Sequence, residues 1–506
     1  MALSELLAAI DLSGESLPAA VSSLRVEGLQ LDSRKLAPGD LFIAFPGQQS
    51  DGRNYLADAQ AAGAVAALVE SEGFSAERAT SALPIIAIEN LAKQVSAIAG
   101  RFYAEPSARV PLIGITGTNG KTTCTQLLAQ LLALLGEPSG LIGTLGYGLL
   151  NSDEPIAKPD LIDTGLTTPD ALSVQAILAE FLDAGAAAVA MEVSSHSLDQ
   201  GRVAGLHFSS AVFTNLSRDH LDYHHTMGAY QQVKAQLFHT PGLKNAIVNS
   251  DDPAGRAIIA ELAACGETSC YSYSSSQVEA DIHARDATFG PQGISANLTT
   301  PWGQGELRSS LQGEFNLSNL LAVIGVACAE GQTLRSVLAA VEQLKPVPGR
   351  LEVVDVQAQP LVVVDYAHSA DALEKALSAL RVACQGRLWC VFGCGGDRDQ
   401  GKRALMGSVA AALADQLVIT SDNPRGEDAQ AIIDDVLQGV PDSATEPQVF
   451  VDRRAAIGFA VNKAAERDVV LIAGKGHEDY QLIKDQRLPF NDVLEARLAL
   501  RQRVVK

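Results

Sequence analysis

Residues 110–136 read VPLIGITGTNGKTTCTQLLAQLLALLG: an apolar run, a short loop containing glycine, and a longer apolar pattern that stops at Gly136. This order predicts a strand, a turn and a helix. Glycines let backbone amides turn toward phosphate oxygens, so that Lys121 could reach the outer phosphates and the Thr122 hydroxyl could ligate Mg²⁺. A strict phosphate-loop pattern has glycine where this chain has Ile115, so the match rests on GKT and the additional Gly117. We therefore predict a phosphate-binding loop, with an ordinary strand-to-helix turn as the alternative.

The length of the chain indicates several domains. At roughly 150 residues per domain, 506 residues suggest about three. A polar stretch ends near Ser107, and the segment KPVPG (345–349) is typical of a stiff linker, so we expect domains at 1–108, 109–345 and 346–506. The third contains four β-rich runs separated by helical patterns, PLVVVD, RLWCVFG, QLVITSD and VVLIAGKG. Strands alternating with helices predict an α/β fold, with a parallel central sheet like that of phosphate-loop ATPases and a Rossmann-like third domain.

Composition excludes several classes of protein. The net charge is −21, which argues against nucleic acid or an anionic membrane as the main partner, since both need a basic face. The N-terminal stretch lacks the basic region of a signal peptide, and no apolar run approaches the ~18 residues that span a bilayer. The seven cysteines are scattered, which favours reduced thiols over a disulfide framework. We expect a cytoplasmic monomer with no membrane insertion.

Charged and polar residues follow the apolar strands of the second block. Glu192 ends the run AAAVAME, and Asp219 and His220 follow SAVFTNLSR. Ligands of open α/β sheets bind outside the carboxyl ends of the strands, so a carboxylate here could hold Mg²⁺. The alternative for Glu192 is that it caps the following turn. His220 could likewise cap a turn, because a single histidine among oxygen ligands is weak evidence for a metal site.

Seven motifs follow one another along the chain: GTNGKTT, EVSSHSLDQGR, FTNLSRDHLDYH, GEFNLSNLLA, PGRLE, DYAHSADALEKAL and GCGGDRDQGKR. Together they resemble the Mur ligase family, the ATP-dependent amide-forming ligases of peptidoglycan precursor synthesis, which share a superfamily with folylpolyglutamate synthases. The N-terminal DSRKLAPGDLFIAFPGQQSDGR resembles the UDP-binding block of the members that add the third peptide residue. The resemblance spans essentially the whole chain.

The resemblance implies a two-step reaction. ATP phosphorylates a peptide carboxylate, and an incoming amine displaces phosphate from the acyl phosphate. Implied catalytic groups are Lys121, Glu192, His220 and Lys234, with Lys234 carbamylated. Implied metal ligands are Thr122, Glu192, His220 and the Lys234 carbamate, with Mg²⁺ as the metal. The implied ATP site comprises Gly117, Thr118, Asn119, Gly120, Lys121, Thr122, Thr123, Asn316, Arg350, Asp365 and His368.

The resemblance also implies the two other substrates. The UDP-N-acetylmuramoyl dipeptide would contact Leu31, Ser33, Gln48, Gln49, Ser50, Thr167, Thr168, Ser194, Gln200 and Arg202. The tetrapeptide DNPR at 422–425 matches the signature of members that add meso-diaminopimelate. The implied amine contacts are Arg398, Asp422, Asn423, Pro424, Arg425, Gly474 and Glu478. Arg425 can pair with the distal carboxylate of this amino acid, and Asp422 or Glu478 with its distal ammonium.

Several alternatives remain open at this point. The same ligase could use L-lysine, although Arg425 would then lack its carboxylate partner. A folylpolyglutamate synthase is disfavoured by the N-terminal block, and a non-catalytic ATP-binding regulator by the retention of Lys121, Glu192, His220 and Lys234. The run GCGGDRD lacks the third spaced glycine of a dinucleotide fingerprint, so a nicotinamide enzyme is disfavoured.

Overall fold

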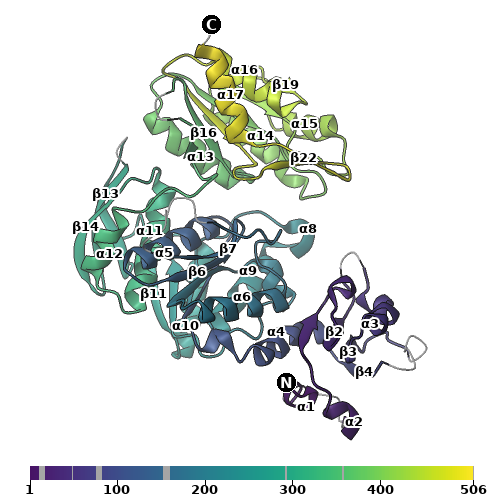
Figure 1. Ribbon diagram of the computed structural model, residues 1–506. Helices are drawn as coiled ribbons and strands as arrows, with labels where there is room; N and C mark the ends of the chain where they lie inside the picture. Colours follow the sequence, from purple (N-terminus) through teal and green to yellow (C-terminus); the bar gives the residue numbers. More distant parts are fainter. Residues whose placement is uncertain are drawn as a thin grey trace.

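A computed structural model describes residues 1–8, 10, 17–47, 50–75, 83–151, 160–290, 293–355 and 358–504. Three α/β units follow one another along the chain, with the N-terminal unit at the lower right of the central one and the C-terminal unit above it in the view of Figure 1. The α/β fold class and the three-unit architecture predicted from the sequence are confirmed; the boundary residues stay predictions. Among the residues described, no helix is both long and apolar enough to cross a membrane.

The N-terminal unit is a parallel sheet in the order β1-β2-β3-β4. The inner strands β2 and β3 are buried at every position, as expected of a sheet covered on both faces. Its strands are β1 (Gly28–Gln30), β2 (Asp40–Ala44), β3 (Ala66–Glu70) and β4 (Ile85–Ile88). Its helices are α1 (Leu3–Leu6), α2 (Ala19–Ser22), α3 (Leu56–Ala61) and α4 (Leu91–Phe102), with 3₁₀ turns at Ser33–Lys35 and Gly52–Tyr55.

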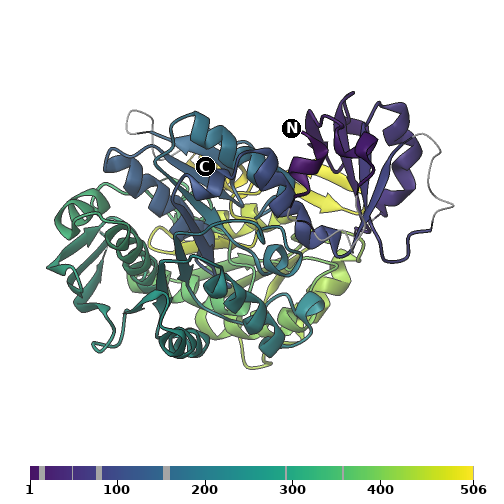
Figure 2. The ribbon, with the colours of Figure 1, turned by 90° about the horizontal axis from the view of Figure 1, so that it is seen from below.

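The central sheet has the order β14-β13-β12-β11-β10-β9-β5-β8-β6-β7. It is parallel from β12 to β6, while β13, β14 and β7 join antiparallel, because these edge strands return through tight hairpins instead of helices. The strands are β5 (Leu112–Thr116), β6 (Ser139–Gly143), β7 (Gly146–Leu150), β8 (Ala188–Glu192), β9 (Ser210–Phe213), β10 (Asn245–Asn249), β11 (Ser269–Ser274), β12 (Ile282–Gly290), β13 (Gly293–Thr300) and β14 (Gly303–Ser309). Figure 2 shows the N-terminal unit at the end of the central unit away from β13 and β14.

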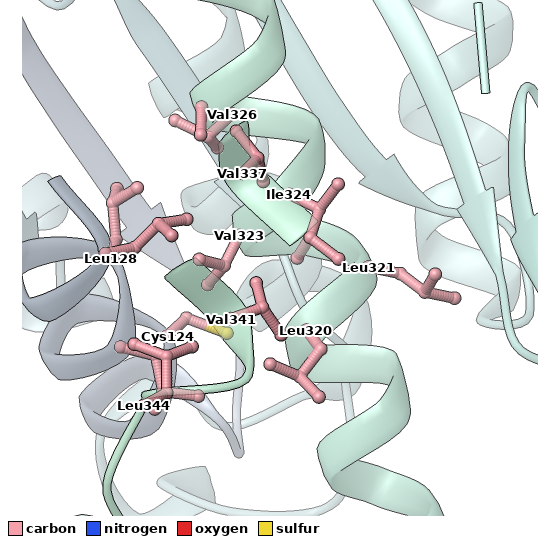
Figure 3. Close-up of a cluster of buried hydrophobic side chains, with 14 of the residues drawn as sticks. Cys124, Leu128, Leu320, Leu321, Val323, Ile324, Val326, Val337, Val341 and Leu344 are labelled. Carbon is pink, nitrogen blue, oxygen red and sulfur yellow. The ribbon is translucent and has the colours of Figure 1, made fainter. Parts of the chain in front are cut away.

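Helices cover both faces of the central sheet. On one face α5 and α11 are buried nearly all round, and they pack with α12 around Cys124, Leu128, Leu320 and Val341 (Figure 3). Helices α6 and α10 cover the other face. The helices are α5 (Lys121–Leu134), α6 (Ala171–Asp183), α7 (Ser195–Asp199), α8 (Leu221–His224), α9 (Met227–Ala235), α10 (Pro253–Cys265), α11 (Glu314–Ala329) and α12 (Leu334–Val341), with 3₁₀ turns at Pro106–Ala108 and Gln236–His239.

The C-terminal sheet has the order β15-β16-β20-β17-β18-β19, and only β15 pairs antiparallel among the described strands of this sheet. The four β-rich runs of the sequence form β16, β17, β18 and β20. The strands are β15 (Glu352–Val353), β16 (Leu361–Asp365), β17 (Leu388–Phe392), β18 (Gln416–Thr420), β19 (Gln448–Phe450) and β20 (Val469–Ala473), followed by the hairpin β21 (Tyr480–Ile483) and β22 (Gln486–Pro489). The helices are α13 (Ala370–Ala383), α14 (Gly401–Leu413), α15 (Ala429–Leu437), α16 (Arg453–Lys463) and α17 (Asp492–Val504).

Candidate active site

The loop between β5 and α5 and the first residues of the helix, 117–123, which we call the phosphate loop, have the geometry of an anion-binding turn. Gly120 precedes the helix with φ +88°, and a Cβ atom there would lie 2.7 Å from Asn319 Oδ1, so glycine is required. Lys121 begins the helix, and its Nζ donates to the carbonyl oxygens of Gly117 at 3.0 Å and Thr118 at 2.9 Å. Desolvation lowers the pKa of Lys121. The loop therefore presents backbone amides and a lysine at a helix N-terminus, where phosphate binds well.

Glu192 lies against this loop at the end of β8. Its carboxylate accepts hydrogen bonds from Thr122 Oγ1 at 3.0 Å, Thr144 Oγ1 at 3.1 Å and the Thr144 amide at 2.7 Å, and the side chain is buried. The cap of the following helix α7 is supplied by Ser194, whose hydroxyl accepts from the Ser197 amide. Glu192 thus faces the phosphate loop and does not cap the turn. Sequence reasoning missed Thr144, which no motif marks.

Lys234 projects from α9 into the same region. Its side chain is 1% exposed, and Nζ donates to the Gly117 carbonyl oxygen at 2.7 Å and lies 4.7 Å from the centre of the Tyr230 ring. Burial, together with the charge of Lys121, lowers the pKa of Lys234 well below its usual value. A lysine in this position is held in its neutral form more easily than one in water.

His220 follows β9 and precedes α8, and its side chain makes no capping hydrogen bond there. Its Nε2 lies 3.6 Å from the Asp219 carboxylate, and its ring packs edge-on against His196 at 5.1 Å. Desolvation lowers the pKa of His220 to about 3, which favours the neutral imidazole. Asp219 also faces His368 at 3.6 Å and Lys402 at 3.5 Å, both from the C-terminal unit. The central and C-terminal units therefore meet at Asp219.

The metal-ligand set implied by the resemblance is only partly assembled. Thr122 and Glu192 are hydrogen-bonded to each other, whereas the contacts of His220 and Lys234 given above go to other groups. Across the described stretches, no cluster of three or more His, Cys, Asp or Glu side chains is arranged to hold a metal ion. A hydroxyl and one carboxylate nevertheless fit Mg²⁺, which keeps several waters and binds through few protein oxygens and substrate phosphates.

The linker before β15 brings Arg350 onto the phosphate loop. Arg350 Nη2 donates to Thr122 Oγ1 at 3.1 Å, and its guanidinium lies over the Tyr366 ring at 4.7 Å. Asp365 accepts from the Leu351 amide at 2.8 Å, which fixes the linker. Asn119 Nδ2 donates to Asp371 Oδ2 at 2.6 Å, a further contact between the two units.

Beside this junction lies a cavity of about 730 Å³. Its wall includes Asn119, Gly120 and Thr123 of the phosphate loop, and Arg350 and Asp365 of the C-terminal unit. The volume is suited to a small ligand. Asn319, which sequence reasoning did not select, also lines it, while the predicted Asn316 holds Asn319 by accepting from its Nδ2 at 3.1 Å.

The residues implied for the muramoyl dipeptide fall into two groups. Thr167, Thr168, Ser194, Gln200 and Arg202 form one network beside Glu192: Arg202 donates to the Thr168 carbonyl oxygen and to Gln200 Oε1, and Thr168 Oγ1 donates to the Glu192 carbonyl oxygen. Leu31, Ser33 and Ser50 belong to the N-terminal unit, which Figure 1 shows apart from the C-terminal unit. Gln48 and Gln49 lie outside the described residues.

All but one of the residues implied for the amine lie together at the carboxyl ends of β18 and β20; the exception is Arg398. Asn423 Nδ2 donates to Glu478 Oε2 at 2.9 Å, and a Cβ atom on Gly474 would lie 2.5 Å from Asp422 Oδ2. Arg425 has φ +51°, and its Nη1 donates to the Gly396 carbonyl oxygen at 2.8 Å. Pro424 is buried between Asn423 and Arg425. Arg398 is exposed on the loop after β17. We call the group Asp422, Asn423, Arg425, Gly474 and Glu478 the amine pocket.

The amine pocket adjoins the phosphate loop through aromatic rings in contact. The centre of the His477 ring lies 5.0 Å from that of Tyr366, and the Arg350 guanidinium lies over the same Tyr366 ring. Sequence reasoning missed Tyr366, His477 and Lys475, although the strand-exit motifs DYAH and AGKGHED contain them. A pocket with a guanidinium and a carboxylate beside a phosphate loop can bring an amino acid to a phosphorylated group.

Comparison with known proteins gives a consistent result. The Mur ligase family, catalytic domain matches residues 25–103, the Mur ligase middle domain 115–327, and the Mur ligase, glutamate ligase domain 349–476. The chain is 51% identical to the UDP-N-acetylmuramoyl-L-alanyl-D-glutamate--2,6-diaminopimelate ligase of Pseudomonas aeruginosa over 96% of both chains. It is 51% identical to the enzyme of the same name from Ectopseudomonas mendocina, over 96% of this chain and 97% of the relative.

A solved structure of an enzyme with this same name is also similar. It is 36% identical, superimposes with a TM-score of 0.70, and the match covers 100% of both chains. Matches along the whole length place all three units in one known architecture. This chain belongs to the Mur ligase family.

Proposed function

We propose that this protein is the ATP-dependent ligase that adds meso-diaminopimelate to UDP-N-acetylmuramoyl-L-alanyl-D-glutamate during peptidoglycan precursor synthesis. The observation that carries the proposal is the amine pocket, where the loops after β18 and β20 bring Arg425 and Glu478 together through Asn423, which donates to Glu478 at 2.9 Å. Identity with the ligases described above supports it along the whole chain. We place the enzyme in the cytoplasm as a monomer.

The reaction follows from the chemistry of the substrates. A carboxylate oxygen of the dipeptide attacks the γ-phosphorus of ATP, the bond to the bridging oxygen breaks, and ADP leaves. The amine of diaminopimelate then attacks the carbonyl carbon of the acyl phosphate, and phosphate departs from the tetrahedral intermediate with the electrons of the C–O bond. The amine proton is lost to solvent or a nearby base. The first step brings two anions together, and the second develops negative charge on the carbonyl oxygen and the departing phosphate, so cationic groups at the site lower both barriers.

The residues of the phosphate loop and linker supply those cationic groups. Lys121 and Arg350 converge on the loop from two units and would pair with the phosphates of ATP in place of their present partners. Thr122 and Glu192 would hold Mg²⁺, which when bound offsets the charge of the phosphates. Asn119, Asp365 and His368 would close over the nucleotide, and Arg202 would pair with the dipeptide or its diphosphate.

Lys234 is the group we propose to be carbamylated. A neutral buried amine can add to carbon dioxide, forming an N–C bond and releasing one proton, and the product is an anion that still carries an N–H. That N–H can keep the hydrogen bond to Gly117. The new carboxylate would extend toward the region of Glu192 and His220 and help to hold Mg²⁺.

Phosphate release is the test of the proposed reaction. With ATP, Mg²⁺ and UDP-N-acetylmuramoyl-L-alanyl-D-glutamate, we expect release that depends on meso-diaminopimelate and is not supported by L-lysine. Release with L-lysine but not with meso-diaminopimelate would agree with a ligase of this kind and would overturn the assignment of the amine. Release with neither amine would overturn the proposal and favour a folate-type ligase.

Arg425→Ala is expected to raise the KM for diaminopimelate about 10²-fold while the KM for ATP changes by less than about threefold, since the guanidinium would pair with the distal carboxylate of the amine. Steady-state kinetics with each substrate varied in turn give both values. Arg487→Ala is a matched control, because that guanidinium is 58% exposed on β22. Equal changes in the KM for diaminopimelate and the KM for ATP would show that Arg425 does not contact the amine.

A further inference from the structure

The amine pocket has a buried lysine in its wall to which the proposed reaction gives no role. Lys475 follows Gly474 in the loop after β20, and its side chain is 0% exposed. Gly474 has φ +119° and packs directly against Asp422, so this loop and the loop 422–425 are in contact. Burying a charged side chain is costly unless it is paired. A lysine buried to this extent is therefore expected to have specific polar partners.

Those partners are two residues of the amine pocket. Lys475 Nζ donates to Glu478 Oε2 at 2.8 Å and to Asn423 Oδ1 at 3.1 Å. Asn423 Nδ2 also donates to Glu478 Oε2 at 2.9 Å, and the Leu482 amide donates to Asn423 Oδ1 at 2.9 Å. These four hydrogen bonds fix the orientation of both side chains.

The same arrangement leaves one carboxylate oxygen for a substrate. Lys475 and Asn423 both bond to Oε2 of Glu478, and within the described chain Oε1 accepts no hydrogen bond. The Glu478 side chain is 15% exposed, so it is not fully enclosed by the protein. It is in position to accept from an ammonium group.

Lys475 also sets the charge of the pocket. Four charged side chains are counted here: Asp422 and Glu478 contribute two negative charges, and Arg425 and Lys475 contribute two positive charges, so their sum is zero. Arg398 is exposed on the loop after β17 and is left out of this sum. The distal head of diaminopimelate is a zwitterion with the same sum, whereas the end of L-lysine is a single cation. Without Lys475 the pocket would carry a net charge of −1 and would suit the cation better.

We propose that Lys475 is a positioning residue that makes the ligase select an amine with a zwitterionic far end, by orienting Asn423 and Glu478 and balancing the charge of the pocket. This inference rests on the proposed function. It assigns Lys475 no contact with the reacting atoms. Its effect is therefore expected in the binding of the amine and not in the use of ATP.

The test compares Lys475→Gln with the wild-type enzyme. Glutamine keeps a hydrogen-bond donor at this buried position and removes the charge. We measure the KM for meso-diaminopimelate, the KM for ATP, kcat, and the inhibition constant of L-lysine in the same reaction. The ratio of the lysine inhibition constant to the diaminopimelate KM is expected to fall about tenfold or more, with the KM for ATP within about threefold of wild type.

Three further variants separate selectivity from folding. Glu478→Gln makes the pocket more positive and should move the ratio in the opposite direction, whereas simple loss of structure would move both variants the same way. Lys475→Arg keeps the charge and should retain the ratio within about threefold even where kcat falls. Lys484→Gln is the charge control: its side chain is exposed, and its amide donates to the Arg425 carbonyl oxygen at 2.7 Å.

The outcomes distinguish this inference from the proposed function. The role of Lys475 is overturned if the ratio is unchanged in Lys475→Gln, or if the KM for ATP rises as much as the KM for diaminopimelate. Neither result contradicts the proposed ligase activity. If Lys475→Gln fails to fold, the test is Glu478→Gln. A fall in its ratio of the lysine inhibition constant to the diaminopimelate KM overturns the role of Lys475, and a rise in this ratio supports it. A wild-type enzyme that releases no phosphate with diaminopimelate overturns both.

Discussion

Replacing Lys234 with alanine is expected to lower kcat about 10²–10³-fold, the size of effect seen when one group that stabilises charge is removed from an active site. The side chain is buried against the phosphate loop, with Nζ at 2.7 Å from the Gly117 carbonyl oxygen. In the proposed enzyme its carbamate is an anion that helps to hold Mg²⁺. The variant lacks that anion and leaves a space in its place. Phosphate release under saturating substrates measures the loss.

Rescue by small acids makes this prediction specific. Acetate or propionate can enter the space left in Lys234→Ala and supply a carboxylate, so part of the activity should return as the acid is added. Lys234→Arg fills the space with a long side chain that cannot form the carbamate, and we expect it to be equally poor and not rescued. Lys244→Ala, at an exposed lysine of the same unit, should respond to neither treatment. Wild-type turnover in Lys234→Arg would exclude the carbamate.

Replacing Arg453 with methionine is expected to lower the free energy of unfolding of the C-terminal unit by about 3–5 kcal/mol, because it leaves a buried charge without its partner. Arg453 pairs with Asp492 through Nε at 2.8 Å and Nη2 at 2.7 Å, and both side chains are 0% exposed. The same guanidinium donates to the carbonyl oxygens of Ala473 at 2.9 Å and Ser421 at 3.4 Å. Those two residues immediately precede the loops of the amine pocket.

Tryptophan fluorescence can follow this unit by itself. The chain has two tryptophans, Trp302 between β13 and β14 and Trp389 in β17, so a Trp302→Phe background leaves only the reporter of the C-terminal unit. Trp389 packs edge-on against Phe459 of α16 at 6.4 Å, the helix that begins at Arg453. Urea titration of this reporter gives the change in stability.

Two comparisons check the cause of the loss. Arg454→Met removes the neighbouring guanidinium, which is 65% exposed and pairs with Glu495, and should cost only about 0–1 kcal/mol. Arg453→Met with Asp492→Leu removes both buried charges and should recover most of the loss. If Arg453→Met and Arg454→Met had equal effects, the buried pair would not be the source of stability.

Much of the fold could be predicted from short stretches of sequence. The strand, turn and helix at 110–136 appear as β5, the phosphate loop and α5, because apolar runs and glycines act through local conformation. The four β-rich runs of the third block form strands for the same reason. The motifs also indicated which loops carry polar residues, since parallel strands end at one edge of a sheet.

The contacts of the candidate site depended on residues far apart in the chain. Asp219 meets His368 and Lys402 of another unit, and Thr144 joins Glu192, although neither pairing is marked by spacing or composition. The parallel pattern predicted for the central sheet also gave no sign of its antiparallel edges. The roles of these groups in catalysis stay predictions.

The sequence by itself determined which segments form strands, helices and the glycine-containing turn before α5, and which residue types stand at the strand ends. Only the tertiary structure decided that Lys475 is buried between Asn423 and Glu478 and that Arg453 joins Asp492 beneath the amine pocket. The reason is physical. Periodicity and turn preferences act over a few residues, whereas burial and charge pairing depend on which distant side chains the folded chain places within about 3 Å of each other.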